Sequence, residues 1–248
     1  MDSPFVSSGL AHVWTQGDWV TRSVALVLLT MSLASWIIIL WKALDLRAQR
    51  AQARGVEGFW HSSDFAEGLE KLGDAEGNPF RTAAIEGREA ARHITHQDGA
   101  SRPQLHDNLD VSDWIERALR KSVDDFTIRA QGGLSVLASV ASTAPFVGLF
   151  GTVWGIYHAL LSIGSSGQVA IDKVAGPIGE ALIMTALGLL VAIPAVLGYN
   201  ALVRGNKAVL HKLNRFAHDL HAYFVTGARV SVGVEGKVLP IKQQQQRG

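Results

Sequence analysis

The chain has 248 residues, with 23 lysines and arginines against 22 aspartates and glutamates; 48% of its residues are hydrophobic and 18% are charged. It contains no cysteine, which excludes a disulfide-stapled secreted domain, a cysteine-based zinc module and a thiol catalyst. The near-zero net charge gives no support to nucleic-acid binding.

Three long stretches of the chain are almost free of charge. Residues 23–41 carry none, residues 130–171 have His158 as their only ionisable side chain, and Glu180 alone interrupts residues 174–203. A bilayer core about 30 Å thick is crossed by roughly 20 apolar helical residues. The second stretch is too long for one span, and the sequence GSSG at 164–167 divides it.

These stretches predict an all-α integral membrane protein with transmembrane helices at 22–42, 133–162 and 176–203. The alternative is a soluble all-helical protein with buried helices, but soluble cores rarely contain uncharged runs of this length. The first run lacks the basic start and the cleavage site of a signal peptide, which favours a retained anchor.

The basic residues predict the orientation. Thirteen lysines and arginines lie between Lys42 and Arg129 and eight follow from Arg204 onward, whereas residues 1–21 contain none. Because basic segments remain on the cytoplasmic side, residues 1–21 and the turn 163–175 are predicted to be periplasmic. The segments 43–132 and 204–226 are predicted to be cytoplasmic, and the tail 227–248 to be disordered.

The two cytoplasmic segments have helical patterns. Apolar residues recur at helical spacing from Trp114 to Phe126, and again from Val209 to Phe224. We expect one long helix to run from residue 110 into the second span, although Gly132 and Gly133 are a weak point. The two extensions are expected to pack into a cytoplasmic helical bundle.

Glu180 is the main candidate for function. A carboxylate inside a span costs a few kcal/mol on insertion scales, so it normally faces a cavity or a partner. Such a buried group suits proton uptake and release. The simpler interpretation is that Glu180 lies near the outer headgroups and only solvates the end of the helix.

Small residues dominate the second and third spans, and some of them recur at four-residue steps. They allow either close helix packing or a narrow pore lining, and spacing alone favours packing. Glu180 and Thr185 lie about 140° apart on an ideal helix, so spacing does not place them on one face. The packing candidates are Gly148, Gly151, Gly155, Gly188 and Ala192, and the hydroxyl-bearing candidates are Thr152 and Thr185.

Two prolines, Pro145 and Pro194, lie inside predicted spans, where each removes a helix hydrogen bond. They are candidate hinges, although a packing kink is the commoner explanation. The histidines complete no familiar metal pattern, and phosphate-binding loops and hydrolase constellations are absent from the sequence. We therefore expect no metal, no cofactor and no enzymatic activity.

The sequences TAPFVGLFGTVWGI (143–156) and AGPIGEALIMTALGLLVAIPAVLGYN (175–200) resemble the MotA/TolQ/ExbB proton channel family. The resemblance is specific across 140–204 and extends over about 105–226. The N-terminal third is similar only in its layout. One departure is that Ala175-Gly176-Pro177 stands where the family usually has Ala-Pro-Gly, so the start of the third span is expected to differ slightly.

The resemblance implies a Gram-negative inner-membrane subunit that assembles as a homopentamer around the transmembrane helices of ExbD. Such a ring uses the proton motive force to energise TonB, which drives outer-membrane uptake of siderophores and vitamin B12. Glu180 matches the glutamate of the family motif, and Thr152 and Thr185 match its pore-facing threonines. The essential aspartate belongs to ExbD.

Within the family, the string at 143–147 and the segment 214–224 favour the ExbB type. A TolQ-like subunit of the Tol-Pal motor is the nearest alternative, and a passive scaffold that stabilises ExbD and TonB explains the small-residue packing equally well. A membrane enzyme has no supporting constellation. Besides these proteins, membrane lipid is the expected partner.

Overall fold

The computed structural model describes residues 18–73, 77–95, 111–166 and 171–227, and within them the ordered elements are all helices. The all-α prediction is confirmed over this part of the chain. Most of residues 1–21, part of the turn 163–175 and nearly all of the tail lie outside the described residues. The helices are α2 (Trp19–Trp60), α3 (Phe65–Lys71), α4 (Pro79–Thr95), α5 (Val111–Gln131), α6 (Leu134–Ser166) and α7 (Ile171–Thr226).

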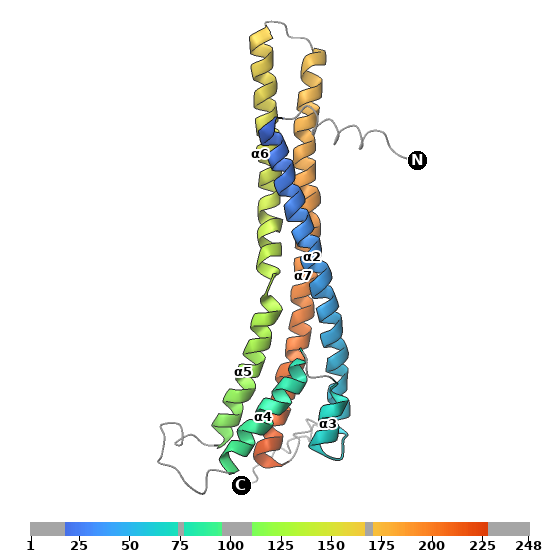
Figure 1. Cartoon of the computed structure of the whole chain (residues 1–248), viewed down its shortest axis with the longest axis vertical. Helices are drawn as coiled ribbons and strands as arrows, with labels where there is room; N and C mark the ends of the chain where they lie inside the picture. The colour runs from blue at the N-terminus through green and yellow to red at the C-terminus, as the bar shows by residue number, and fades with distance from the viewer. Residues whose placement is uncertain (1–17, 74–76, 96–110, 167–170, 228–248) are drawn as a thin grey trace, which may run out of the picture.

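The molecule is a long column built around α2, α6 and α7 (Figure 1). The described residues contain three helical stretches that are long and apolar enough to cross a membrane. With 56 residues, α7 spans about 84 Å at 1.5 Å per residue. It therefore reaches well beyond the roughly 30 Å of a bilayer core.

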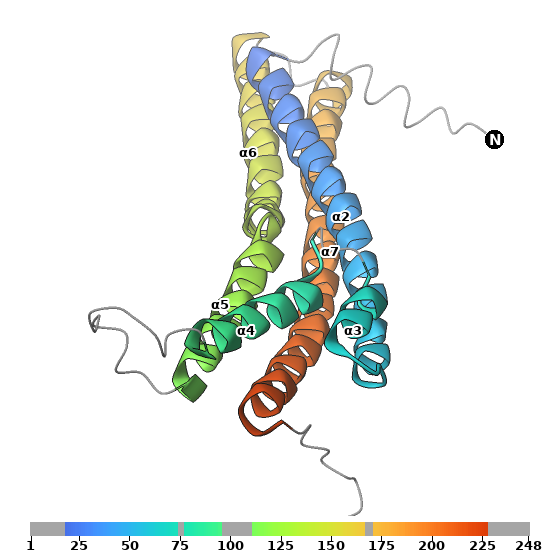
Figure 2. The same ribbon diagram turned by 60° about the horizontal axis from the view of Figure 1, so that its bottom comes forward.

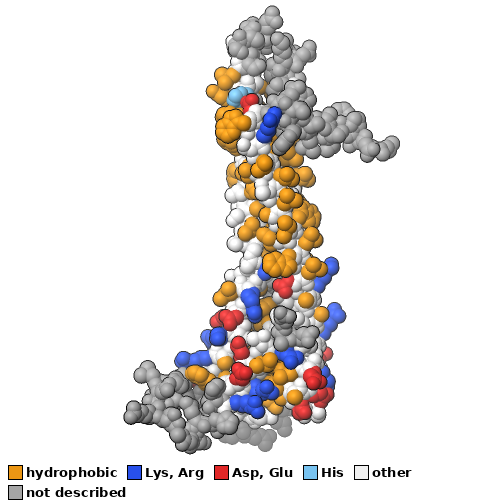
Figure 3. Space-filling view, viewed as in Figure 1, with side chains coloured by type: hydrophobic (Ala, Val, Ile, Leu, Met, Phe, Trp, Pro, Cys, Tyr) orange, Lys and Arg blue, Asp and Glu red, His pale blue; other side chains and the backbone are white. Residues whose placement is uncertain are grey.

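One portion of the column carries an apolar surface, and charged side chains gather at the end that contains α3, α4 and α5 (Figure 3). We call this end the charged end. Large apolar side chains exposed along the upper column include Leu29, Leu33, Ile37 and Leu40 on α2, Phe146 and Val153 on α6, and Leu190, Ile193 and Leu197 on α7. Such a surface is stable in lipid or against other protein, not in water.

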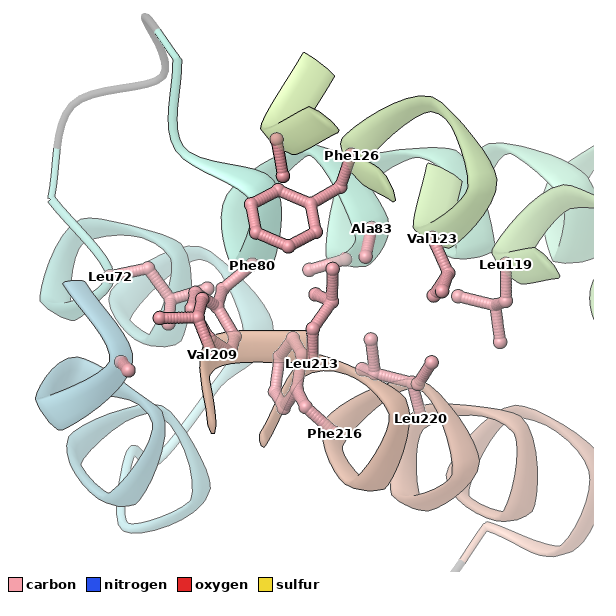
Figure 4. Close-up of a cluster of buried hydrophobic side chains, with 14 of the residues drawn as sticks. Leu72, Phe80, Ala83, Leu119, Val123, Phe126, Val209, Leu213, Phe216 and Leu220 are labelled. Carbon is pink, nitrogen blue, oxygen red and sulfur yellow. The ribbon is translucent and has the colours of Figure 1, made fainter. Parts of the chain in front are cut away.

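The charged end has its own hydrophobic core, in which α4 lies across α5 and α7 (Figure 2). Figure 4 shows side chains from these helices meeting around Phe80 and Phe216. Both phenylalanines are almost fully buried, and their rings lie 5.9 Å apart at the centroids in an edge-on arrangement. Phe59 of α2 makes a similar contact with Phe216 at 5.3 Å, so one aromatic side chain joins three helices.

Asn78 fixes the start of α4 inside this core. It is fully buried, and its Oδ1 accepts a hydrogen bond from the backbone N–H of Phe80 at 3.1 Å. Its Nδ2 donates to the carbonyl oxygen of Leu72 at 2.6 Å. Asn78 thus acts as an N-cap and attaches the start of α4 to the chain after α3.

Replacing Phe216 with alanine is expected to destabilise the charged end. Loss of a buried phenylalanine costs about 3–5 kcal/mol, and here it removes contacts to both α2 and α4. Chemical unfolding of the purified protein in mixed micelles measures the change. Val225→Ala on the same helix, where the valine is exposed, is the control and should be nearly neutral; equal effects of the two substitutions would contradict this account of the core.

The expectation of one continuous helix from residue 110 into the second span was wrong. The chain breaks between α5 and α6, where Gly133 has φ +79°, a backbone conformation that side-chain-bearing residues rarely adopt. The N–H of Gly132 bonds back to the carbonyl oxygens of Ile128 and Arg129 at 3.2 and 3.3 Å. A glycine in the left-handed conformation after a helix is a common helix terminator.

At the opposite end of the column, α6 and α7 extend beyond the ranges predicted for the spans. Helix α6 continues to Ser166 and α7 begins at Ile171, before Pro177. Pro177 is the seventh residue of α7, beyond the first turn, so its missing N–H removes one intrahelical hydrogen bond. These extra turns lengthen the α6–α7 hairpin.

Candidate functional site: the α6–α7 interface

Two glycines bring α6 and α7 into backbone contact. A Cβ atom on Gly148 would lie 2.7 Å from the carbonyl oxygen of Met184 and 3.0 Å from the Cα of Gly188. A Cβ on Gly188 would lie 2.7 Å from the carbonyl oxygen of Ala144. No side chain fits at either position without moving backbone, so the two helices approach as closely as small-residue interfaces allow.

The neighbouring small residues extend this packing. A Cβ on Gly151 would lie 3.0 Å from the Cβ of Met184 and 3.1 Å from a methyl group of Val24, so α2 also packs here. One turn further, a Cβ on Gly155 would lie 2.9 Å from that of Ala181. Ala192 is buried in the same core. The five packing candidates therefore all lie where helices of the column meet.

Thr152 and Thr185 meet inside this tight interface. Their hydroxyl oxygens are hydrogen-bonded to each other, and the Thr152 hydroxyl also lies 3.0 Å from the carbonyl oxygen of Ala181 on α7 and 3.2 Å from that of Gly148 on its own helix. Thr152 is 7% exposed. Both carbonyls can only accept, so Thr152 accepts from Thr185 whenever it donates its single proton to one of them.

Glu180 is one residue before this polar contact along α7. It is half-buried and directly precedes Ala181, whose carbonyl oxygen is within hydrogen-bond distance of Thr152. Since Ala181 lies against Gly155, Glu180 sits at the level of Gly155, about one turn beyond Thr152 on α6. The structure thus brings the two threonines together and places Glu180 next to a residue that they contact.

Both prolines lie within continuous helices. Pro145 is half-buried in α6, and Pro194 is half-buried in α7. Pro145 follows Ala144, whose carbonyl oxygen lies at the glycine contact with α7. Their use as hinges stays a prediction.

Sequence reasoning missed a polar contact between α2 and α6. Nδ1 of His158 lies 3.2 Å from Oδ2 of Asp18, which precedes α2. The His158 ring also lies against Trp154, with 4.8 Å between centroids. The only sequence signal was an ionisable side chain inside an otherwise charge-free stretch. Among the described residues, no group of three or more histidines, aspartates and glutamates is arranged to hold a metal ion.

Thr152→Val is expected to lower the thermal stability of the purified protein. Valine keeps the shape but leaves the Thr185 hydroxyl without its acceptor inside the interface, at a cost of about 1 kcal/mol. Thr152→Ser keeps the hydroxyl and should lose clearly less, despite missing a methyl group. A valine variant as stable as the serine variant would show that the contact contributes little.

The fold and this interface define a helical membrane protein of three spans, in which the last two spans share a tight small-residue contact and a buried polar pair. The chain belongs to the MotA/TolQ/ExbB proton channel family, whose model matches residues 87–215. It is accordingly an energy-transducing subunit of the ExbB/TolQ type in the inner membrane, and the family is not one of enzymes.

Individual relatives match over most of the chain. The biopolymer transport protein ExbB of Xanthomonas campestris pv. campestris (strain B100) is 41% identical over 232 residues, covering 90% of both chains. ExbB of Neisseria meningitidis serogroup B is 40% identical over 86% of this chain and 95% of its own. The Tol-Pal system protein TolQ of Pseudomonas aeruginosa is 32% identical over 82% of this chain and 87% of its own. The similarity thus extends beyond the 105–226 expected from the motifs.

Proposed function

We propose that this chain is the ExbB-type subunit that uses the proton motive force to energise TonB, with ExbD as its second membrane partner. The work done by the complex is outer-membrane uptake of siderophores and vitamin B12. The ExbB proteins of X. campestris and N. meningitidis are 40–41% identical to the chain, against 32–35% for two TolQ proteins, and these identities support the ExbB assignment.

The charged end faces the cytoplasm in this proposal. Twenty-one of the 23 lysines and arginines lie in residues 42–129 and 204–248, and short basic segments next to spans stay on the cytoplasmic side. Lys42, Arg129 and Arg204 directly flank the three uncharged stretches of the sequence. The opposite end, with Asp18 and His158, then faces the periplasm.

The observation that carries the proposal is the buried Thr152–Thr185 contact, which also involves the carbonyl oxygen of Ala181, the residue after Glu180. A carboxylate inside a span can take up and release a proton. Hydroxyl groups at a helix interface can both donate and accept hydrogen bonds. In a homopentamer, five such interfaces surround the ExbD helices. The carboxylate of ExbD is the main proton carrier, and Glu180, Thr152 and Thr185 supply the polar wall around it.

A TolQ-like role is the second candidate, because TolQ proteins are also similar over most of the chain. Two measurements in bacteria that lack ExbB and TolQ separate the two functions. The first is siderophore uptake, and the second is the detergent resistance of the envelope. The chain, expressed with its ExbD partner, should restore uptake of an iron-siderophore and leave the envelope defect. Restoration of the envelope alone would assign it to the Tol-Pal motor.

A further inference from the structure

The junction between α5 and α6 is held by side chains from both other long helices. Lys42 of α2 donates from Nζ to the carbonyl oxygen of Arg129 at 2.8 Å. Asn206 of α7 donates from Nδ2 to the carbonyl oxygen of Ala130 at 2.9 Å. These carbonyls belong to the last turn of α5, where carbonyl oxygens lack intrahelical N–H donors. The side chains of Lys42 and Asn206 supply donors in their place.

The core of the charged end extends across this junction, because it includes Leu134 and Leu137 at the start of α6. Helix α5 contributes to the core of the charged end through residues such as Phe126 and Ala130. From Val140 onward, α6 contributes to a second core with α2 and α7. Figure 1 shows the chain narrowing to a short link between α5 and α6, while α7 continues past it without a break.

A cavity of about 660 Å³ lies beside the junction. Helices α5 and α6 and the glycine link form one wall, and α7 forms the other. Its lining includes Ala130, Gly132, Ser135, Tyr199, Asn206 and Lys207. Side chains of this chain therefore do not fill the space between the glycine link and α7.

We propose that Gly132 and Gly133 are a mechanical joint and that Lys42 and Asn206 are its positioning residues. Through this joint the charged end sets how α6 lies against α7, and therefore the alignment of Thr152 with Thr185. Thr152 is 19 residues from Gly133, a lever of about 28 Å, so a tilt of about 5° moves it by roughly 2.5 Å. Such a shift is enough to break a hydrogen bond.

The α6–α7 contact itself allows small adjustments. Around Gly148 and Gly188 the helices meet backbone to backbone, so no long side chains interlock there. Helix α7, which is continuous past the junction, keeps its position, and α6 moves relative to it. The role of this joint in energy transduction rests on the proposed function. Its geometry does not, and it can be tested without any transport measurement.

The absence of cysteine in the native chain makes disulfide cross-linking a clean readout of this geometry. Gly155→Cys with Ala181→Cys places two thiols one turn from Thr152, at positions where the ideal Cβ atoms are 2.9 Å apart. Disulfides form at Cβ separations of about 3.5–4.5 Å. A slight separation of α6 from α7 therefore permits the disulfide, and a larger displacement slows its formation. The full chain is assayed in membranes together with ExbD.

Gly133→Ala, which disfavours the left-handed backbone, should slow cross-linking by roughly tenfold. Lys42→Met and Asn206→Leu should each slow it in the same direction, and Lys42→Arg should restore the parental rate because it keeps the donor. Gly73→Ala is the matched control. Gly73 also has a positive φ, +85°, with open space around it, but it lies in the loop after α3 and should leave the rate unchanged.

Parental cross-linking rates in both the Lys42→Met and Asn206→Leu variants would overturn the proposal. These two variants decide the question even if Gly133→Ala fails to accumulate. Equal slowing by Gly73→Ala would also overturn it, because the effect would then reflect general loosening of the charged end. Loss of the proposed function is read separately, from uptake by Glu180 variants, so the two failures are distinguishable.

Discussion

Glu180→Ala is expected to reduce TonB-dependent siderophore uptake to background while the protein accumulates and assembles with ExbD normally. Glu180 is half-buried on α7 and adjoins Ala181, whose carbonyl oxygen contacts Thr152. Alanine has a high helix propensity and fits in the space of glutamate, so the fold survives. What is lost is the single acidic side chain in residues 174–203. Uptake of a radiolabelled iron-siderophore measures the effect.

Glu180→Gln separates a proton-handling group from a structural one. Glutamine keeps the size and the hydrogen-bonding capacity of a protonated glutamate but cannot take up or release a proton. The motor proposal therefore predicts a loss close to that of Glu180→Ala. Normal uptake in the glutamine variant, at normal abundance of the complex, would instead identify the chain as a passive scaffold for ExbD and TonB.

Gly188→Leu is expected to prevent stable packing of the column. A Cβ at this position would lie 2.7 Å from the carbonyl oxygen of Ala144 and 3.0 Å from the Cα of Gly148. Overpacking typically costs about 1–3 kcal/mol when side chains can adjust, and here the obstacle is backbone. We expect a loss at or above the upper end of that range, with α6 and α7 forced apart and the Thr152–Thr185 contact broken.

The abundance of the variant in membranes and its thermal unfolding in detergent measure this effect. Gly164→Leu is the matched control, because Gly164 lies on α6 with no other atoms within 4 Å of its ideal Cβ. It should accumulate normally. A Gly188→Leu protein with parental abundance and melting temperature would mean that α6 and α7 are not in backbone contact in the membrane.

Charge distribution was sufficient to predict the helical membrane class. Soluble cores rarely contain uncharged runs of this length, so three long apolar helices followed directly from them. The break between α5 and α6 was not predictable with the same certainty. Gly132 and Gly133 are compatible with a weak helix as well as with a terminator, and the choice depends on Lys42 and Asn206, which come from distant parts of the sequence.

The candidate site was predictable residue by residue but not as an arrangement. Small residues in the second and third spans pointed to close packing, and the glycines indeed lie at helix contacts. Helical spacing left open whether Thr152 and Thr185 meet, because that depends on the rotation of α6 against α7. The Asp18–His158 contact was out of reach for a related reason: its partners are far apart in the sequence and no local pattern joins them.

The order of the long helices along the chain has a consequence for biogenesis. Helix α2 ends at Trp60, whereas α7, against which it packs, begins only at Ile171, 111 residues later. At about 5–20 residues per second, synthesis takes roughly 6–22 seconds to cover that distance. During this time the face of α2 that includes Val24 and Leu28 remains in contact with lipid. The first span is therefore an independent insertion unit, and its native neighbours reach the bilayer later, as a hairpin.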